Sequence, residues 1–333
     1  MGTNFENIEL FDRIALQATK LYDFGPQAQA RLLVLSENAT YLVSDPVSGD
    51  KLGVLRIGRP GYHTLEEYQS EIAWLRQIND YTPLIVANPI PASDGSYIQQ
   101  VDDGAGNSFV CIVTEFLEGN APDEEDLEHV VDQFRLLGQT TAYLQRQTTI
   151  WNKTKDLSRW HWDFEHVIGE NAVWGRWQDF PGITPEEEAQ LGACAAIIKR
   201  RLERYGVTPD NYGLIHADLR QANILVDGDQ IKVIDFDDCG FGWHVQDLAS
   251  AISFIEHKEI VPDLVNAWIE GYRKVLPFTD TDFMEIDTFI MMRRMQLTAW
   301  LASHMDSDPV KELSIGWMEG TMGLALRFLR LFG

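Results

Sequence analysis

The stretch Tyr212–Ala249 (YGLIHADLRQANILVDGDQIKVIDFDDCGFGWHVQDLA) carries the residue types and spacing that most clearly indicate chemistry. Asp218 follows His216 by two positions, and Asn223 follows Asp218 by five. A strand–turn–strand pattern comes next and ends at Asp235, so we expect the hairpin to bring Asp218, Asn223 and Asp235 together at its open end. Two carboxylates and one amide oxygen on short loops would make a hard-oxygen site suited to Mg²⁺.

The spacing matches the kinase pattern H-x-D-x-x-x-x-N followed by D-F-x. The alternative is a turn-rich hairpin whose Asp and Asn residues only cap turns. Three features together favour the kinase-like interpretation: the His-x-Asp start, the apolar interval before Asp235, and a β-rich region upstream. A motif of this kind remains a hypothesis until its structural context is known.

The elements that must position these residues fall into two groups. Residues 1–117 predict a mostly antiparallel sheet with one important helix, Thr64–Ile78, which opens on a capping Thr64 with Glu67 three residues later. A further amphipathic helix is expected over residues 7–22. From residue 118 helices dominate, beginning with one that opens on the acidic residues 123–128 and including Pro185–Tyr205. The expected strands are Arg31–Leu35, Thr40–Val43, Lys51–Ile57, Ser96–Val101 and Ser108–Phe116.

On these residues the chain resembles the aminoglycoside phosphotransferase and choline kinase superfamily. IDFDDCGFGWHVQDLA is typical of these phosphotransferases, SENATYLV resembles their phosphate loop, and KLGVLRI resembles their nucleotide-clamping strand. HWDFEHVIGENAVWGRW resembles the branch of the bacterial stress-response kinase and homoserine-kinase-type proteins. The resemblance implies an α+β, bilobal, protein-kinase-like fold. Residues 1–117 would form a small antiparallel-β, nucleotide-binding N-lobe, and residues 118–333 a larger helical, catalytic and acceptor C-lobe.

The resemblance also implies the roles of the catalytic loop. Asp218 would accept or orient the proton of the acceptor hydroxyl, and Arg220 would steady the transferring phosphoryl group. Asn223 and Asp235 would hold Mg²⁺, with ATP as the phosphoryl donor. His216 would brace the loop, or be an ordinary core histidine.

For the nucleotide, the resemblance implies a phosphate loop at residues 36–40, where Ser36, Asn38 and Thr40 replace a glycine-rich loop. An ordinary hairpin turn is the alternative there. Arg56 stands where kinases often have Lys and would pair with Glu71, while Arg59 is a weaker alternative. The hinge would be residues 114–117, with Glu115 and Leu117 offering backbone groups to adenine.

The acceptor is not fixed by these motifs. Asp237 and Asp238 are expected near it, whereas Asp247 is expected to be a structural cap or loop brace. Residues 151–180 hold five of the ten tryptophans and would either wall the acceptor or pack an insertion. Arg293 and Arg294 would face either an acceptor carboxylate, as homoserine would need, or solvent. At least one of them is expected to face solvent because neighbours on a helix point about 100° apart.

Three functions stay open from the sequence. The first is a kinase acting on a small-molecule hydroxyl, such as that of an amino alcohol, an amino acid like homoserine, or an aminoglycoside. The second is a Ser/Thr protein kinase of the stress-response type. The third is a non-catalytic nucleotide-binding pseudokinase, which the intact Asp218, Asn223 and Asp235 disfavour.

Composition limits the partners. The 333 residues include 27 Lys and Arg and 51 Asp and Glu, giving a net charge of −24. Such an acidic chain is a poor general nucleic-acid binder. Its three cysteines lie far apart without a C-x-x-C pair, which indicates neither a disulfide framework nor a zinc site. No basic start precedes an apolar run and no apolar stretch approaches ~18 residues, so we expect a cytoplasmic protein without a membrane partner.

Overall fold

The computed structural model describes residues 8–122, 129–227 and 230–333. The acidic helix opening predicted at residues 123–128 and the turn residues 228–229 lie outside this description. The chain divides into two compact units. The first comprises residues 1–120, 156–158 and 225–234, and the second comprises residues 121–155, 159–224 and 235–333.

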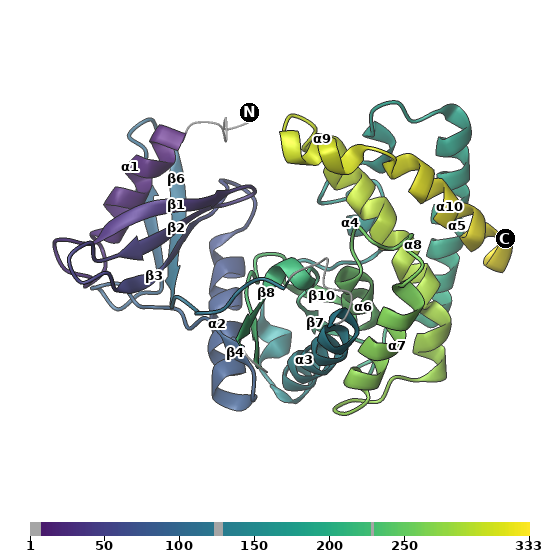
Figure 1. Cartoon of the computed structure of the whole chain (residues 1–333), viewed down its shortest axis with the longest axis horizontal. Coiled ribbons are helices and arrows are strands. Elements are labelled where there is room, and N and C mark those ends of the chain that lie inside the picture. Colours follow the sequence, from purple (N-terminus) through teal and green to yellow (C-terminus); the bar gives the residue numbers. More distant parts are fainter. Residues whose placement is uncertain (1–7, 123–128, 228–229) are drawn as a thin grey trace. The chain divides into compact units, whose positions relative to one another are not determined.

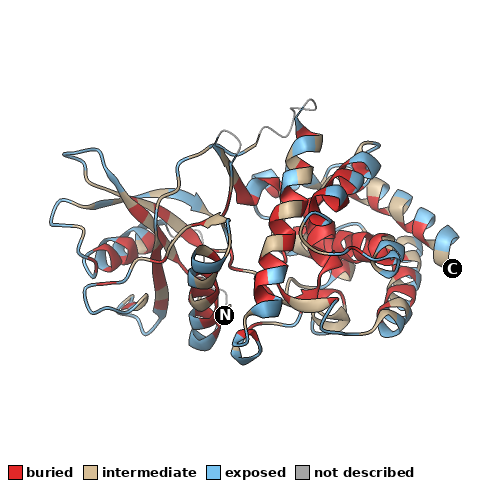
Figure 2. Cartoon of the chain, turned by 90° about the horizontal axis from the view of Figure 1, so that it is seen from below, coloured by how far each residue is buried: buried red, intermediate tan, exposed pale blue. Residues whose placement is uncertain are grey.

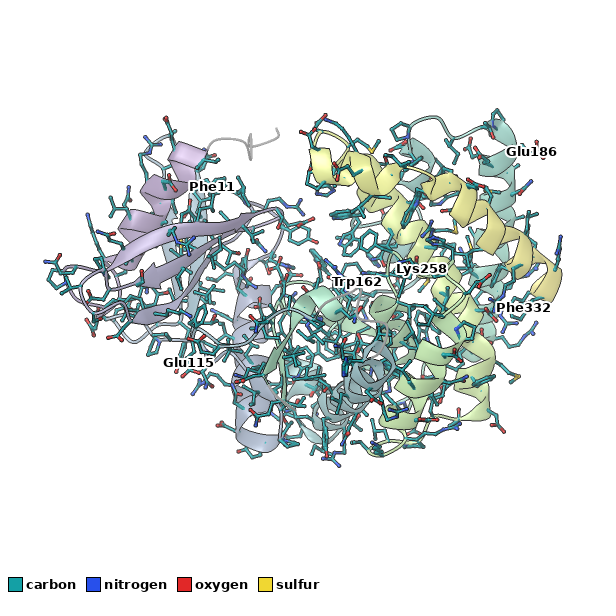
Figure 3. The ribbon with its side chains drawn as sticks, in the orientation of Figure 1. Phe11, Glu115, Trp162, Glu186, Lys258 and Phe332 are labelled. Carbon is teal, nitrogen blue, oxygen red and sulfur yellow. The ribbon has the colours of Figure 1, made fainter. Side chains whose placement is uncertain are left out.

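The first unit is built on a five-stranded antiparallel sheet (Figure 1). Its order is β1 (Gln29–Leu35), β2 (Ala39–Ser44), β3 (Lys51–Ile57), β6 (Ser108–Thr114) and β5 (Ile98–Asp102). Strand β2 alternates buried and half-buried residues, as expected for a strand with one face on a core. Helix α1 (Ile8–Thr19) covers that face and carries Phe11, which is labelled in Figure 3. Phe11 meets Phe109 edge to face, with ring centroids 5.9 Å apart.

Helix α2 (Leu65–Tyr81) begins where the sequence predicts. The Thr64 hydroxyl accepts the Glu67 backbone N–H, and the Glu67 carboxylate accepts the Thr64 N–H, which forms a complete capping box. A small second sheet in this unit has the order β4 (Ile85–Val86), β9 (Gln230–Val233), β8 (Ile224–Asp227), with β4 parallel to β9. The sequence did not indicate β4, because two residues are too short to show a pattern.

The second unit is mostly helical and carries one antiparallel pair, β7 (Tyr212–Ile215) with β10 (Gly240–Trp243). Its helices are α3 (Val130–Ile150), α4 (Phe164–Val167), α5 (Pro185–Tyr205), α6 (Val245–Ala251), α7 (Val261–Tyr272), α8 (Asp280–Ser303), α9 (Asp308–Ser314) and α10 (Trp317–Phe332). Single 3₁₀ turns lie at Thr154–Asp156, Trp177–Asp179 and Gln221–Asn223.

Helices α3 and α7 pack side by side with their backbones nearly in contact (Figure 1). A Cβ atom at Gly138 would lie 1.9 Å from the Trp268 carbonyl oxygen, and one at Gly271 would lie 1.8 Å from that of Arg135. Both distances are far inside van der Waals contact, so these two positions accept only glycine. The close approach fixes α3, whose side chains reach the candidate site.

Burial follows the two units, with buried residues on the inner faces of the helices and the sheet (Figure 2). All three cysteines are buried free thiols. Among the described residues, no helix is long and apolar enough to cross a membrane.

Candidate active site

The predicted catalytic loop lies in the second unit, between the end of β7 and the 3₁₀ turn Gln221–Asn223. His216 is fully buried, and its Nδ1 accepts the Asp218 backbone N–H at 3.4 Å. Its ring lies 4.7 Å from the ring of Phe236, centroid to centroid. His216 is therefore a buried histidine that contacts the catalytic loop, which agrees with the loop-bracing alternative.

The Asp218 carboxylate is held at both oxygens. Arg293 Nη2 donates to Oδ1, and Asn223 Nδ2 donates to Oδ2 at 2.8 Å. Arg220 Nε lies 3.5 Å from the same Oδ2. The side chain of Asp218 remains 16% exposed, so the carboxylate is both fixed and accessible. The structure thus brings Asp218, Asn223 and Arg220 together.

Asn223 has its amide orientation set by Asp218. Its Nδ2 donates to both the Asp218 carbonyl and the Asp218 carboxylate, at 2.8 Å each. The amide oxygen at the other end is therefore the atom left to meet a cation, which is the ligand type that Mg²⁺ prefers. This orientation fits the predicted role of Asn223.

Asp235 lies two residues after the end of β9 (Gln230–Val233) and is exposed. Its φ of 61° lies in the left-handed region that a non-glycine residue seldom adopts and that functional sites often contain. An exposed carboxylate in such a place suits a hard cation. Among residues 8–122, 129–227 and 230–333, no group of three or more His, Cys, Asp and Glu could hold a metal; Mg²⁺ typically uses one or two carboxylates plus substrate phosphates instead.

Ala217 is a second left-handed residue, with φ of 67°. Its backbone N–H donates to Asp247 Oδ1 at 2.9 Å, and its carbonyl accepts the Ser250 hydroxyl at 2.7 Å. Arg293 Nη1 also lies 3.4 Å from that carbonyl oxygen. Bonds on both sides of Ala217 hold the backbone turn that presents Asp218.

Asp247 on α6 is fully buried, which confirms the expected loop brace. Its other oxygen accepts Gln145 Nε2 at 2.9 Å, and the Tyr272 hydroxyl donates to Gln145 Oε1 at 2.6 Å. Burial raises the pKa of Asp247 to about 6, against the hydrogen bonds from Gln145 and Ala217, which lower it. A chain of bonds therefore runs from α7 through α3 and α6 to the catalytic loop.

The expectation that Arg293 or Arg294 faces solvent was wrong. Their side chains are 4% and 1% exposed, respectively, because each meets a carboxylate inside the unit. Arg294 Nη1 lies 2.9 Å from Glu256 Oε2, and its remaining donors reach the Thr321 hydroxyl and the Trp317 carbonyl. Burial raises the pKa of Glu256 and lowers that of Arg294, so this pair is desolvated on both sides.

The tryptophan-rich segment supports the loop after Asp235. Trp162 is buried, and its Nε1 donates to the Asp238 carbonyl at 2.8 Å. Arg159, also buried, donates to the carbonyls of Asp237 and Cys239. The side chain of Asp237 is buried too. The role of Arg159 was not predicted, because no local pattern links it to a loop about 80 residues away.

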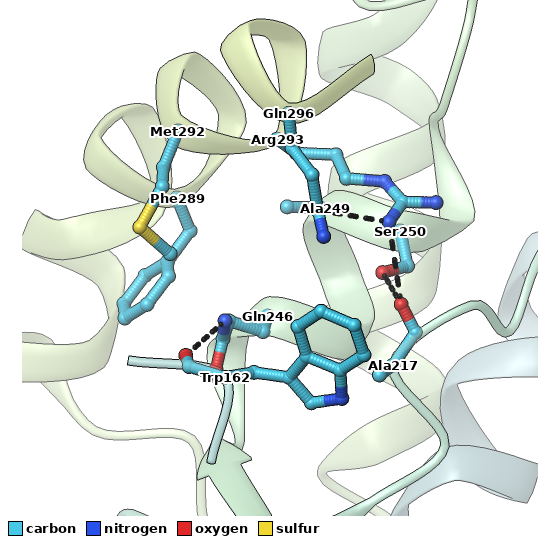
Figure 4. Close-up of a pocket in the computed structure, with 9 residues that line it drawn as sticks. All are labelled: Trp162, Ala217, Gln246, Ala249, Ser250, Phe289, Met292, Arg293 and Gln296. Carbon is cyan, nitrogen blue, oxygen red and sulfur yellow. Dashed lines mark hydrogen bonds between the residues drawn. The ribbon is translucent and has the colours of Figure 1, made fainter. Parts of the chain in front are cut away.

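A small pocket opens beside Ala217 in the second unit (Figure 4). Figure 4 shows Arg293 of α8 and Ser250 of α6 bonded to the same Ala217 carbonyl at its edge. Its lining is mainly neutral, with Arg293 as the one charged member: Trp162, Ala217, Gln246, Ala249, Ser250, Phe289, Met292, Arg293 and Gln296. The lining therefore offers no carboxylate to a cationic group.

In the first unit, the predicted Arg56–Glu71 pair is present. Arg56 Nη2 donates to Glu71 Oε2 at 2.7 Å, and the two side chains are 16% and 3% exposed. The Arg56 guanidinium also lies 5.9 Å from the Tyr68 ring centroid. Arg59, the weaker alternative, stacks instead on Tyr62 at 4.0 Å. Arg56 is therefore tied to helix α2 but still reaches solvent.

The predicted phosphate loop is the turn between β1 and β2. Ser36 is exposed, and its N–H donates to the Asn38 carbonyl at 3.0 Å. Asn38 is buried and accepts the Arg59 N–H at 3.3 Å, so its side chain joins the turn to the end of β3. Thr40 pairs in register with Arg56.

The predicted hinge follows β6. The Glu115 N–H donates to the Asn88 carbonyl at 2.8 Å, and the Glu115 carboxylate accepts Asn88 Nδ2 at 2.8 Å. Because the Glu115 N–H is already bonded to Asn88, the backbone groups predicted to bind adenine are reduced to the Glu115 carbonyl and the backbone of Leu117.

Comparisons with known proteins place the chain among phosphotransferases. The model of the phosphotransferase enzyme family matches residues 31–282. A solved structure of a microcompartment-associated aminopropanol kinase is 40% identical, with a TM-score of 0.88 over 96% of this chain and 98% of that one. Amicoumacin kinase of Bacillus subtilis (strain 168) is 25% identical over 311 residues, 90% of this chain and 88% of the relative.

More distant structures share the architecture. The amicoumacin kinase hAmiN in complex with AMP-PNP, Ca²⁺ and Ami is 22% identical, with a TM-score of 0.75 over 95% of this chain and 93% of that one. These likenesses confirm the α+β, kinase-like fold predicted from the sequence.

Proposed function

Because this chain belongs to the phosphotransferase enzyme family, we propose that it transfers the γ-phosphoryl group of ATP, with Mg²⁺, to the hydroxyl of a small amino alcohol. The observation that carries the proposal is the fixed, accessible Asp218 carboxylate, to which the Asn223 amide nitrogen donates, so that the amide oxygen is left for a cation. The choice of an amino alcohol rests on the relative named an aminopropanol kinase, which is 40% identical over nearly the whole of both chains.

In this proposal the reaction exchanges one P–O bond for another. The bond between the γ-phosphorus and the β,γ-bridging oxygen breaks, ADP leaves, and the acceptor oxygen bonds to phosphorus. Asp218 orients the acceptor hydroxyl and receives its proton on the way to solvent. Because the transition state is loose, orientation contributes more than basicity. Arg220, beside Asp218, steadies the transferring group.

Residues 1–117 handle the nucleotide in this proposal, and residues 118–333 carry the catalytic and acceptor groups. Ser36, Thr40 and Arg56 contact the phosphates. Asn38 and Glu71 hold the phosphate loop and Arg56 in position. Glu115 and Leu117 offer backbone groups to the base. Asn223 and Asp235 hold Mg²⁺, which compensates phosphate charge when bound. Asp238, which is partly exposed, is the carboxylate proposed for the acceptor ammonium, whereas the side chain of Asp237 is buried. The cytoplasmic location stays a prediction from the sequence.

A transfer screen tests the proposal. Mg·ATP is offered with 1-amino-2-propanol, ethanolamine, choline, homoserine, an aminoglycoside and a generic protein, and phosphomonoester formation is followed by ³¹P NMR. We expect the highest kcat/KM with the amino alcohols. Two matched controls test the two functional groups of 1-amino-2-propanol separately. 2-Propanol has the hydroxyl without the amine, and 1,2-diaminopropane has amines without the hydroxyl.

Two outcomes would replace the proposal. Labelled phosphate on protein, with none on the small alcohols, would establish the Ser/Thr protein kinase. Binding of Mg·ATP without turnover on any acceptor would establish the pseudokinase.

A further inference from the structure

Arg293 lies at the middle of α8, 75 residues along the chain from the catalytic loop, yet its guanidinium ends on the Asp218 carboxylate. The Arg293 side chain is only 4% exposed. A buried arginine requires a partner of opposite charge, and the carboxylate that it pairs with here is Asp218.

The guanidinium is anchored independently of Asp218. Its Nε donates to the Ser253 hydroxyl at 2.9 Å, and its Nη1 donates to Gln296 Oε1 at 3.0 Å. The ring of Trp174 lies 4.8 Å from it. Figure 4 shows the bond from Arg293 to Gln296. With Nε and Nη1 held by these partners, the planar guanidinium directs Nη2 toward Asp218 Oδ1.

We propose that Arg293 is a positioning residue for phosphoryl transfer, which fixes Asp218 through Oδ1 and the preceding turn through the Ala217 carbonyl. With Asn223 on Oδ2, the carboxylate then has a single orientation for the acceptor hydroxyl. The inference rests on the proposed function of Asp218. In this proposal α8 holds the short, strained catalytic loop in position, and a displacement of about 1 Å in that loop can lower the rate about 100-fold.

Arg294 supplies a matched control. It is the next residue of the same helix, is equally buried and is equally ion-paired, but its carboxylate is Glu256 and not Asp218. A Lys at either position keeps the charge and loses the planar fork. The same chemical change on neighbouring residues therefore separates an effect on Asp218 from a general loosening of α8.

The experiment measures kcat and KM for 1-amino-2-propanol and for ATP, on protein shown to be folded by thermal unfolding. We expect Arg293→Gln to lower kcat about 100-fold and Arg293→Lys about 10-fold, with KM for ATP within about twofold. Arg294→Lys should leave kcat within about twofold. Ser253→Ala, which removes one anchor and no charge, should lower kcat about threefold.

Chemical rescue and a double-mutant cycle complete the test. Millimolar guanidinium should restore part of the kcat of Arg293→Ala, and the same concentration of potassium should not. In an Asp218→Asn background, Arg293→Gln should have little further effect, because the two residues act through one contact.

Three results would overturn the inference: folded Arg293→Gln with a kcat near that of the natural protein, equal losses in Arg293→Lys and Arg294→Lys, or full additivity with Asp218→Asn. If Arg293→Gln does not fold, the two Lys variants and Ser253→Ala decide. Normal turnover in Asp218→Asn would instead refute the proposed role of Asp218, whichever result the Arg293 variants give.

Discussion

Two arginine–carboxylate pairs, one in each unit, are arranged in opposite senses. In Arg56–Glu71 the carboxylate belongs to a helix and is 3% exposed, while the arginine on a strand is 16% exposed. In Arg293–Asp218 the arginine belongs to a helix and is 4% exposed, while the carboxylate on a loop is 16% exposed. In both, the helix supplies the buried partner.

The two pairs leave opposite charges accessible. A buried anion leaves Arg56 as the accessible group, which suits phosphate oxygens, whereas a buried cation leaves Asp218 accessible, which suits a hydroxyl proton. The pair Arg294–Glu256 has both members buried, at 1% and 0% exposure, and presents nothing. Exposure of one partner thus separates a pair proposed to serve a substrate from one that serves only the fold.

Neutralising Asp218 should have the greatest effect on turnover. Asp218→Asn keeps the shape of the side chain and removes its charge, and loss of general-base help typically costs ~10²–10⁴-fold in rate. We expect kcat to fall by that factor with little change in Mg·ATP affinity, measured by steady-state kinetics and calorimetry. Asp263→Asn, an exposed residue of α7, is the control. A folded Asp218→Asn with normal turnover would contradict the prediction.

The fully buried pair should respond in stability and not in turnover. Arg294→Met leaves Glu256 as an uncompensated buried charge, which typically costs about 3–5 kcal/mol. Arg294→Met with Glu256→Met removes both charges and should recover most of that loss, as urea unfolding would show. If the double variant is no more stable than the single one, the pair is not what holds α8 at this point.

Buried Asp247, which braces the loop of the Arg293–Asp218 pair, should make the free energy of unfolding depend on pH. Its folded pKa of about 6 lies above the unfolded value of about 3.9, so the folded state binds the proton more tightly. Asp247 therefore favours folding increasingly as the pH falls from about 6 to about 4, by about 2–3 kcal/mol in total. Below that window the contribution is fully present, and above it the contribution is lost.

Asp247→Asn isolates this effect, since the other carboxylates titrate in both proteins. Unfolding free energies at pH 7 and pH 4.5 should show the natural protein gaining about 2 kcal/mol relative to the variant at the lower pH. A difference between the two proteins that does not change with pH would show that Asp247 titrates normally.

The smallest expected effect belongs to the first pair. Arg56→Ala should raise KM for ATP about 10-fold with a smaller change in KM for the acceptor, and Glu71→Ala should act in the same direction. The double variant should resemble the single ones, because the residues are coupled. Arg59→Ala is the control, because the Arg59 side chain stacks on Tyr62 and makes no bond to Glu71. Independent effects would mean that the 2.7 Å contact does not hold Arg56 for the nucleotide.

The sequence predicted what depends on neighbours along the chain. The capping box at Thr64 and the spacing from His216 to Asn223 are local patterns, and both appear in the structure. Arg293 and Arg159 could not be placed in this way. Each acts on a carboxylate or carbonyl more than 70 residues away, and a charged residue on a helix resembles a surface residue unless its partner is known.

Ala217 and Asp235, the two residues with left-handed backbone in the candidate active site, lower folding stability where the proposed activity needs a fixed loop. Such backbone strain costs of order 1–3 kcal/mol at each residue, which is a large share of the 5–15 kcal/mol that keeps a domain folded. Ala217→Gly would relieve the strain at that residue and keep the backbone N–H and carbonyl that bond to Asp247, Ser250 and Arg293, but glycine would also give the turn access to other backbone conformations. Selection for thermostability alone would therefore favour substitutions that relieve this strain. A thermostable variant with a lowered kcat should be checked first for substitutions at positions 217 and 235.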